Sequence, residues 1–430
     1  MLFLIQLLAS ILAFISHGHE ARAQPANTYT SLVFPITKHT DTNPLYSIQI
    51  TIKGVSEDYG NYMDPSKVSN YLIDIDAPIV WHDCIDYFQF GPLPISKCKD
   101  AQPYSYNSSS CPPLYLPNYE YYPCPVNVFN PVTRSCDDTY LNADLFEMKT
   151  SDGKSILSGV YRASVRGSCA SRSSFQSFPK DVTGVMAFSS APYALPASLG
   201  LYGEPLSTKF KKITALCLPS NSSTPGVLFV GNGPYYLPPN LDVDIRSLLS
   251  YTPLLKHPDS FGYFISVNAI VIKMRSIIIP VNATTKLSTI EPYTTLRTDI
   301  YTSLVRRFSK VTRRIPSAKP IAPFGLCFST ATNGTKVGLK VPNIDLRLHG
   351  GMTWTISSAN SIKQMTNDVG CLAFVDGGST SETAITIGTF QFENNLVVFD
   401  SENSTFGFSS SLLSQNTSCA NFNFTITMDY

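Results

Sequence analysis

The stretch Tyr71-Leu72-Ile73-Asp74-Ile75-Asp76-Ala77-Pro78-Ile79-Val80-Trp81 places an acidic turn between two apolar runs. The apolar runs predict two β-strands, and together with the turn they predict a strand–turn–strand hairpin with a carboxylate at its tip. A carboxylate at the end of a hydrophobic strand costs free energy unless it is hydrogen-bonded or has a chemical role. Asp74 is therefore the first candidate catalytic residue.

This stretch resembles the hydrophobic-hydrophobic-Asp-Thr-Gly-Ser-x-x-Leu-Trp loop of the pepsin-like aspartic proteases. Asp74 falls on the catalytic aspartate of that loop and Trp81 on its tryptophan, whereas Ile75-Asp76 replaces the Thr-Gly pair. In such proteases each of two lobes supplies one loop. The resemblance implies an all-β, bilobal pepsin-like fold with two β-barrel-like lobes, a cleft between them and few short helices.

Composition agrees with this fold class. The chain has 430 residues, enough for one bilobal body, and its many Pro, Tyr, Phe and Thr residues favour strands and turns. The formal net charge is +1, and no long basic run occurs. We therefore expect neither nucleic acid nor a polyanion as a partner.

The N-terminus indicates export. Residues 1–15 are apolar, and Ala21-Arg22-Ala23 provides the small-x-small triplet of a cleavage site, so residues 1–23 are predicted to be a secretory signal peptide. The alternative, a membrane anchor, needs about 20 apolar residues, and this run is shorter. No later segment is long enough to span a bilayer. The sequence thus predicts a soluble extracellular protein with no membrane partner.

The cysteines and sequons fit an exported protein. Ten cysteines, an even number, indicate a disulfide framework. No cluster has zinc-ligand spacing with a nearby histidine, so neither a metal nor another cofactor is expected. The Asn-x-Ser/Thr sequons predict surface glycosylation; they begin at Asn107, Asn221, Asn282, Asn333, Asn403, Asn416 and Asn423.

The rest of the first half follows the order of elements in a pepsin-like lobe. Asp152-Gly153 predicts a tight hairpin turn, in the region where such a lobe has the flap over its cleft. Residues 183–188 resemble the strand that crosses behind the catalytic loop, and residues 226–232 resemble the strand that closes the lobe. The Pro-rich residues 234–239 then predict the connection between lobes, which gives an N-terminal lobe at 24–239.

The second half repeats this logic, as a bilobal fold requires. Residues 263–272 predict a strand, residues 281–293 occupy the place of the second catalytic loop, and residues 298–308 predict a helix. Residues 385–408 resemble the final Gly-bearing strand and the hydrophobic-Val-Phe-Asp and Gly-Phe strands of a pepsin-like C-terminal lobe. The C-terminal lobe is therefore expected at 240–430.

The second loop lacks its acid. Aligned on Asp-Thr-Gly, the sequence reads Ser288-Thr289-Ile290. Aspartic proteases need two carboxylates that share one proton, because like charges about 3 Å apart cannot both ionise. Serine does not ionise near neutral pH, so Asp74 has no partner with which to form an acid–base pair. This substitution predicts that Asp74 is vestigial and that the protein is not an enzyme.

Two other arrangements of residues could in principle restore catalysis. Asp76 and Glu291 stand close to the two loops, but neither occupies a position mirrored between the lobes, and each is expected to be a turn or solvated carboxylate. A serine hydrolase built on Ser288 would need a histidine, and His82 and His349 exist. No Gly-x-Ser-x-Gly elbow surrounds the serine, which argues against that chemistry.

Four further motifs resemble the plant family of xylanase inhibitors and xyloglucanase inhibitors, which also contains the extracellular dermal glycoproteins, basic 7S globulins and gamma-conglutins. They are residues 323–328, 369–378, 408–413 and 419–424. The resemblance implies the pairs Cys84–Cys169, Cys217–Cys419 and Cys327–Cys371. Cys98, Cys111, Cys124 and Cys136 are left with three possible connectivities.

By this resemblance the protein is a secreted, non-catalytic binder or inhibitor of microbial cell-wall glycoside hydrolases that acts in plant defence. Inhibitory members insert basic loops of the C-terminal lobe into the sugar cleft, and the loops here are residues 332–337 and 377–383. Lys336 keeps a positive charge, while Glu382 stands where an arginine is expected and would repel an acidic active site. The alternatives are a storage-type or ligand-binding globulin and a residual aspartic endopeptidase. The sequence does not indicate an oligomeric state.

Overall fold

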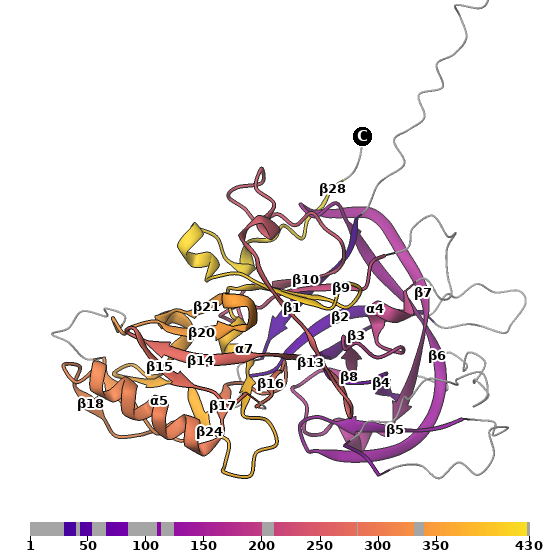
Figure 1. The fold of residues 1–430 in the computed structure, drawn as a ribbon. Coiled ribbons are helices and arrows are strands. Elements are labelled where there is room, and N and C mark those ends of the chain that lie inside the picture. The colour runs from indigo at the N-terminus through magenta and orange to yellow at the C-terminus, as the bar shows by residue number, and fades with distance from the viewer. Residues whose placement is uncertain are drawn as a thin grey trace, which may run out of the picture.

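A computed structural model describes residues 30–39, 44–53, 66–84, 110–112, 124–199, 210–281, 283–330 and 339–427. Within these ranges strands predominate, and the α-helices are α4 (Leu195–Ser198), α5 (Thr298–Val311), α6 (Ser358–Ser361) and α7 (Thr389–Phe392). Figure 1 shows the strands gathered in two lobes. The all-β, bilobal prediction is confirmed.

The largest sheet contains the strands of the first lobe. Its path runs β11-β27-β26-β9-β10-β1-β2-β3-β8-β4-β7-β6-β5, with β28 paired to β7. The bounds are β1 Ser31–Lys38, β2 Tyr46–Lys53, β3 Ser66–Asp74, β4 Val80–Asp83, β5 Pro125–Asn130, β6 Ser135–Ser151, β7 Ile156–Ala170, β8 Val182–Ala187, β9 Ile213–Cys217, β10 Gly226–Gly231, β11 Ser250–Pro253, β26 Leu396–Asp400, β27 Thr405–Phe408 and β28 Ile426–Thr427.

The expected hairpin around Asp74 is wrong. Strands β3 and β4 do not pair with each other, because β8 lies between them, parallel to β3 and antiparallel to β4. Gly184 of β8 makes this possible, since a Cβ atom there would lie 2.4 Å from the Tyr71 ring. The turn at Asp74 thus leads the chain past the end of β8. The carboxylate lies at the end of the parallel strands β3 and β8.

The second lobe repeats this arrangement in its own sheet, whose order is β12-β13-β16-β25-β17-β24. Strand β25 (Ile385–Ile387) lies between β16 (Thr285–Leu287) and β17 (Thr294–Leu296), parallel to the first and antiparallel to the second. The other strands are β12 Leu255–His257, β13 Ser260–Ile265 and β24 Phe374–Asp376. The internal repeat predicted from the sequence is therefore a repeat of topology.

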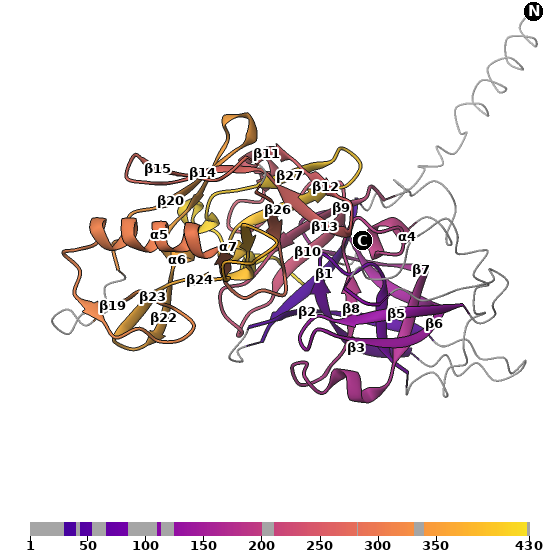
Figure 2. The same ribbon diagram turned by 60° about the horizontal axis from the view of Figure 1, so that its bottom comes forward.

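Two small sheets complete the second lobe, and α5 lies between them (Figure 2). They are β15-β14-β20-β21 and β18-β19-β23-β22. Their bounds are β14 Val267–Ile272, β15 Arg275–Ile278, β18 Ser317–Ala318, β19 Cys327–Ser329, β20 Ile344–Leu348, β21 Thr353–Ile356, β22 Ile362–Thr366 and β23 Val369–Leu372. The helix predicted at 298–308 is present and extends to Val311. The single strand predicted at 263–272 is instead two strands, β13 and β14, in different sheets.

The C-terminal strands connect the two lobes. Strand β26 pairs antiparallel with β9, so a segment from the end of the chain continues the sheet of the first lobe. The disulfide between Cys217 and Cys419 joins the same two parts of the chain. This shared sheet fixes the lobes against each other.

The disulfides include the three pairs that the resemblance implies: Cys84–Cys169, Cys217–Cys419 and Cys327–Cys371. Cys111 is bonded to Cys136, which selects among the connectivities that the sequence leaves open. Cys124 is also disulfide-bonded, and Cys98 lies outside the described residues.

The expected place of the flap is wrong as well. The turn at Gly153 joins β6 to β7, but its carbonyl accepts a hydrogen bond from the backbone of Tyr236 (3.0 Å). A Cβ atom on Gly153, whose φ is 93°, would clash with the carbonyl of Pro234. This hairpin end therefore packs on residues 234–236, and Gly153 is not among the residues that line the cleft. The turn between β5 and β6 borders the cleft instead.

A buried ion pair lies at the junction of the lobes. Lys38 at the end of β1 contacts Glu393, which follows α7, at 2.5 Å, and both side chains are about 5% exposed. The Tyr46 hydroxyl donates to the same carboxylate oxygen (2.7 Å). Burial raises the pKa of Glu393, while the charge and the hydrogen bond of Lys38 oppose this shift. The charge on the Lys38 ammonium group and the charge on the Glu393 carboxylate thus stabilise each other in this buried site.

We expect Glu393→Gln to destabilise the fold by about 3 kcal/mol, because it leaves the Lys38 ammonium buried without a counter-charge. The free energy of unfolding from denaturant titration at pH 7 measures the effect. Asp242→Asn is the matched control, since it neutralises an exposed carboxylate. Equal stability of the two variants would contradict the importance of this pair.

Candidate functional site

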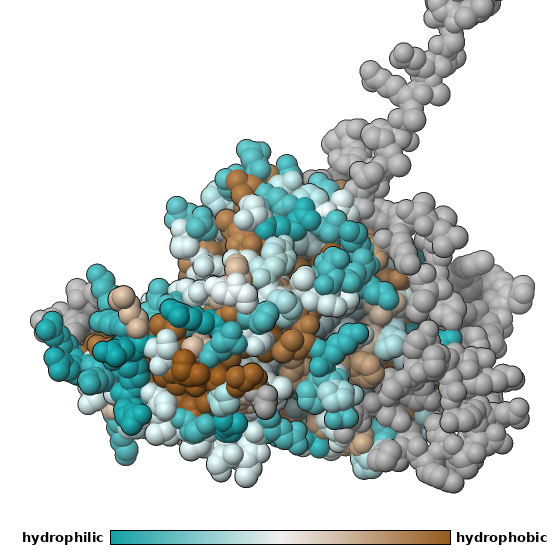
Figure 3. All heavy atoms as spheres, viewed as in Figure 1, coloured by the Kyte–Doolittle hydropathy of each residue, from teal (hydrophilic) through white to brown (hydrophobic). Residues whose placement is uncertain are grey.

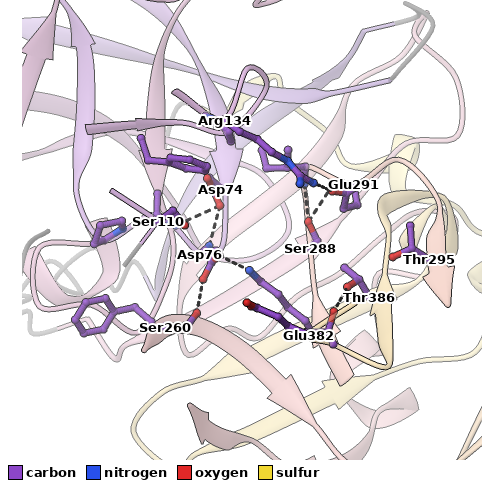
Figure 4. Close-up of a pocket in the computed structure, with 18 of the residues that line it drawn as sticks. Asp74, Asp76, Ser110, Arg134, Ser260, Ser288, Glu291, Thr295, Glu382 and Thr386 are labelled. Atoms are coloured by element: carbon purple, nitrogen blue, oxygen red, sulfur yellow. Dashed lines mark hydrogen bonds and ion pairs between the residues drawn. The ribbon is translucent and has the colours of Figure 1, made fainter. Parts of the chain in front are cut away.

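The candidate site lies where the two repeated loops meet. Asp74 is the last residue of β3, and Ser288 directly follows β16. In both lobes a crossing strand, β8 or β25, runs parallel to the strand that leads into the loop. Figure 4 shows Asp74 and Ser288 in the same pocket, with the Ser110 side chain pointing toward Asp74.

Asp74 and Ser288 make equivalent hydrogen bonds. Asp74 Oδ1 accepts from the backbone N–H groups of Asp76 (2.8 Å) and Ala77 (3.2 Å). Ser288 Oγ accepts from those of Ile290 (3.1 Å) and Glu291 (3.0 Å), the same two positions further along its own loop. Serine therefore keeps the turn that an aspartate forms here, but it brings no carboxylate.

Thr289 joins the two loops directly. Its hydroxyl donates to the carbonyl of Ile73 (2.7 Å) and accepts from the backbone N–H of Ile75 (3.3 Å). Ile75 stands where the first loop of a pepsin-like protease has its threonine, and its side chain is buried in the core. The equivalent contact from the first loop to the second is thus replaced by apolar packing of the Ile75 side chain. Thr289 is the threonine that connects the lobes at this point.

The two nearby acids are held by cations of the opposite lobe. Asp76 forms an ion pair with Lys286 and accepts a hydrogen bond from Ser260 Oγ (2.7 Å). Glu291 forms an ion pair with Arg134 of the β5–β6 turn at 3.2 Å, and Figure 4 shows these two side chains pointing toward each other. The sequence gives no signal for either pair, because each joins residues more than 150 positions apart.

The environment of Asp74 favours its protonated form. Burial, followed by the charge of Asp76, raises the pKa of Asp74 to about 6. The N–H groups of Asp76 and Ala77 and the charge of Lys286 lower it in part. A neutral Asp74 can donate a hydrogen bond, but general acid–base catalysis by a carboxylate pair needs a second acid.

The pocket around these residues has a volume of about 740 Å³. The first lobe contributes Trp81, Phe129 and Arg134, and the loop at 377–383 of the second lobe contributes Glu382, whose side chain is exposed. The predicted binding loop with Glu382 therefore borders the same cleft as Asp74. Lys336, in the other predicted loop, lies outside the described residues.

The predicted glycosylation sites are on the surface where the structure describes them. Asn221, Asn403, Asn416 and Asn423 are exposed, and glycosylation there stays a prediction. The sequons at Asn107, Asn282 and Asn333 lie outside the described residues. His82 contacts Asp144 and His349 lies on the surface, away from Ser288. Over the described ranges, no group of three or more His, Cys, Asp or Glu side chains is placed to hold a metal ion.

Comparison with known families identifies the fold and the relatives. The Xylanase inhibitor N-terminal model matches residues 61–232, and the Xylanase inhibitor C-terminal model matches residues 262–410. The chain belongs to the xylanase-inhibitor family. The two matches fall on either side of the boundary expected between residues 239 and 240, which itself stays a prediction.

Relatives within this family carry different names. The chain is 33% identical over 372 residues to "Chitinase CLP" of Oryza sativa subsp. japonica, covering 83% of this chain and 86% of the relative. It is 35% identical over 368 residues to "Gamma conglutin 1" of Prunus dulcis, covering 82% and 83%. The solved structure "Crystal structure of edgp" matches with a TM-score of 0.79 and 31% identity, over 94% of this chain and 100% of that one. The pepsin-like fold is thereby confirmed.

The raised pKa of Asp74 predicts a specific pH dependence of stability. In the unfolded chain an aspartate has a pKa near 4, so between about pH 4 and 6 the folded protein binds more protons and its stability falls as the pH rises. Asp74→Asn removes this fall while its amide oxygen still accepts both N–H groups. We expect the variant to be more stable at pH 7 by up to about 3 kcal/mol, with no difference at or below pH 4.

Denaturant unfolding over a series of pH values tests this. Asp244→Asn serves as the control of opposite sign, because the hydrogen bonds and charge of Arg246 lower the pKa of Asp244. This control is less stable at neutral pH, and the difference disappears as the pH falls through the pKa of the folded state. Parallel stability curves for the wild type and Asp74→Asn would contradict the raised pKa.

Proposed function

We propose that this protein is a secreted, non-catalytic member of the xylanase-inhibitor family that binds and inhibits a microbial cell-wall glycoside hydrolase. The proposal that the protein is non-catalytic rests on Ser288, which makes the same kind of backbone hydrogen bonds as Asp74 but has no carboxylate. Family membership supports the binding part.

Catalysis by an aspartic dyad needs one charged and one protonated carboxylate at the same water molecule. Asp74 is placed for one of these roles. The two acids next to the loops are held by cations, since Asp76 pairs with Lys286 and Glu291 with Arg134. Both pairs also connect the lobes across the cleft, where a peptide substrate would otherwise lie. These contacts support loss of proteolysis.

Inhibition of a glycoside hydrolase needs a surface that fits an acidic sugar cleft. The cleavage of glycosidic bonds uses a pair of carboxylates, so a cation on the inhibitor is favourable and an anion is unfavourable. Lys336 would supply the cation. Glu382, exposed at the rim of the pocket, works against binding, and this one residue favours the second candidate function, a storage-type or ligand-binding globulin.

An inhibition assay separates these two candidates. We expect the purified protein to slow at least one enzyme in a panel of microbial xylanases and xyloglucanases. Lys336→Ala should weaken inhibition by about 10-fold and Glu382→Arg should strengthen it, because both change the charge presented to the catalytic carboxylates. Lys180→Ala, which removes an exposed lysine outside the pocket, is the control. Absence of binding to every enzyme in the panel would favour the globulin.

A cleavage assay addresses the remaining alternative, a residual aspartic endopeptidase. We expect no hydrolysis of an unfolded protein substrate between pH 3 and 6, because one carboxylate cannot act as both acid and base in the dyad. Any trace of cleavage should be the same in the wild type and in Asp74→Asn, measured by release of new N-termini. Cleavage that Asp74→Asn abolishes would establish the endopeptidase.

A further inference from the structure

The outer face of the second lobe carries the most exposed apolar side chains in the described part of the chain. Met274 is 95% exposed, Ile278 is 73% exposed and Val281 is 99% exposed, whereas no other large hydrophobic side chain there exceeds 55%. All three lie at or directly after the β14–β15 hairpin. Figure 3 shows hydrophobic side chains gathered over β14 and β15, beside hydrophilic ones over α5.

A cluster of cations surrounds these apolar residues. It consists of Lys273 and Arg275 in the hairpin, Arg306, Arg307 and Lys310 on α5, and Arg313 and Arg314 directly after the helix. Residues 273–281 and 300–319 contain no acid. Within the described part of the chain none of these seven cations forms an ion pair. Their charges are therefore left to interact with a partner.

A side-chain contact makes the helix and the hairpin one surface. The Arg307 guanidinium donates to the carbonyls of Ile272 (3.2 Å) and Lys273 (3.3 Å), which stand at the hairpin turn. Arg307 of α5 is thus held beside the hairpin turn that carries the exposed Met274. We call the three apolar residues and the seven cations the hairpin surface.

The turn of this hairpin has an unusual sequence for its geometry. Lys273 and Met274 form the two-residue connection between Ile272 and Arg275, and their φ angles are 44° and 62°. Hairpin turns with two positive φ angles strongly prefer Asn-Gly, because other residues are strained in this conformation. A cation and a methionine occupy the tip despite that strain, and strain of this kind is typical of functional sites.

We propose that the hairpin surface docks on an anionic lipid surface, in contrast to the expectation from the sequence that the protein has no membrane partner. Met274, Ile278 and Val281 would enter the boundary between headgroups and acyl chains, while the cations of the hairpin and α5 contact lipid phosphates. No helix in the described ranges is long and apolar enough to cross a membrane. The lipid contact is independent of the glycoside hydrolase proposed above.

The chemistry of the surface favours lipid over other anionic partners. A polyuronate or another acidic polysaccharide needs the cations but gives no reason for three exposed aliphatic side chains. An acidic protein would need a surface complementary to a protruding turn. A lipid surface is both anionic and soft, so it accepts a protruding apolar tip with cations around it.

Vesicle co-sedimentation of the purified protein tests the proposal. We expect binding to phosphatidylcholine vesicles that contain 30% phosphatidylglycerol, weaker binding to pure phosphatidylcholine, and loss of binding as NaCl rises. The double variant Arg313→Glu/Arg314→Glu should bind at least about 10-fold more weakly. Lys211→Glu/Lys212→Glu is the matched control, because it reverses an exposed pair of neighbouring lysines at the start of β9, far from α5.

A tryptophan at the tip reports insertion. The chain has two tryptophans, Trp81 and Trp354, and each is 1% exposed. Met274→Trp should therefore add a fluorophore whose emission shifts to the blue with anionic vesicles and is quenched by brominated acyl chains. Val68→Trp, at another exposed apolar position, is the control and should show no shift.

The outcomes separate the partners. Binding that depends on the arginines together with quenching at position 274 supports the proposal. Equal binding of the two charge-reversal variants overturns it. Binding to polygalacturonate that depends on the arginines, without quenching by lipid, assigns the surface to an acidic polysaccharide instead. Concentration-dependent dimerisation that Met274→Ser abolishes, without binding to vesicles, assigns it to a second copy of this chain through the edge of β15.

Discussion

Where the loops of the two lobes meet, this protein has one carboxylate in place of the two that an aspartic protease has. The chemistry of the cleft follows from this difference. Each lobe brings a loop to the junction by the same crossing-strand topology, and each loop is closed by a side-chain oxygen that accepts two backbone N–H groups. Two carboxylates in contact must share a proton because of their mutual repulsion. With Ser288 in one loop, this repulsion is absent. The turn therefore persists without the pair that would use it for catalysis.

Much of the fold was predictable from local patterns. The strand before Asp74 and the helix at 298–308 were predicted from the residues themselves, and the crossing element at 183–188 from its resemblance to pepsin-like lobes; each is present. The hairpin at Asp74 was mistaken because β8, which separates β3 from β4, comes more than 90 residues later in the chain. Local sequence shows that two strands flank a turn, but it does not show that a distant third strand lies between them.

The site was predictable only as far as its residue types. Asp74 and Ser288 could be placed by comparing two loops, whereas the cations that hold Asp76 and Glu291 could not. Lys286 and Arg134 reach these acids from the opposite lobe, and nothing near them in the sequence indicates that contact. The net charge of +1 is similarly uninformative about local fields. It is a sum in which the seven cations of the hairpin surface, which form no ion pair within the described part of the chain, are offset by acids elsewhere.

The contrast between Asp74 and Ser288 explains why one acid is retained in a cleft without a dyad. Both side chains do the same structural work, so a serine at position 74 would also close its turn. An aspartate has an additional effect there, since Lys286 stabilises negative charge at both Asp74 and Asp76. Burial opposes this and raises the pKa of Asp74 to about 6, so the residue changes charge in the acidic range. Asp74 therefore changes charge with pH next to Ile73 and Ile75, which contact Thr289 of the second lobe, whereas a serine at this position would not.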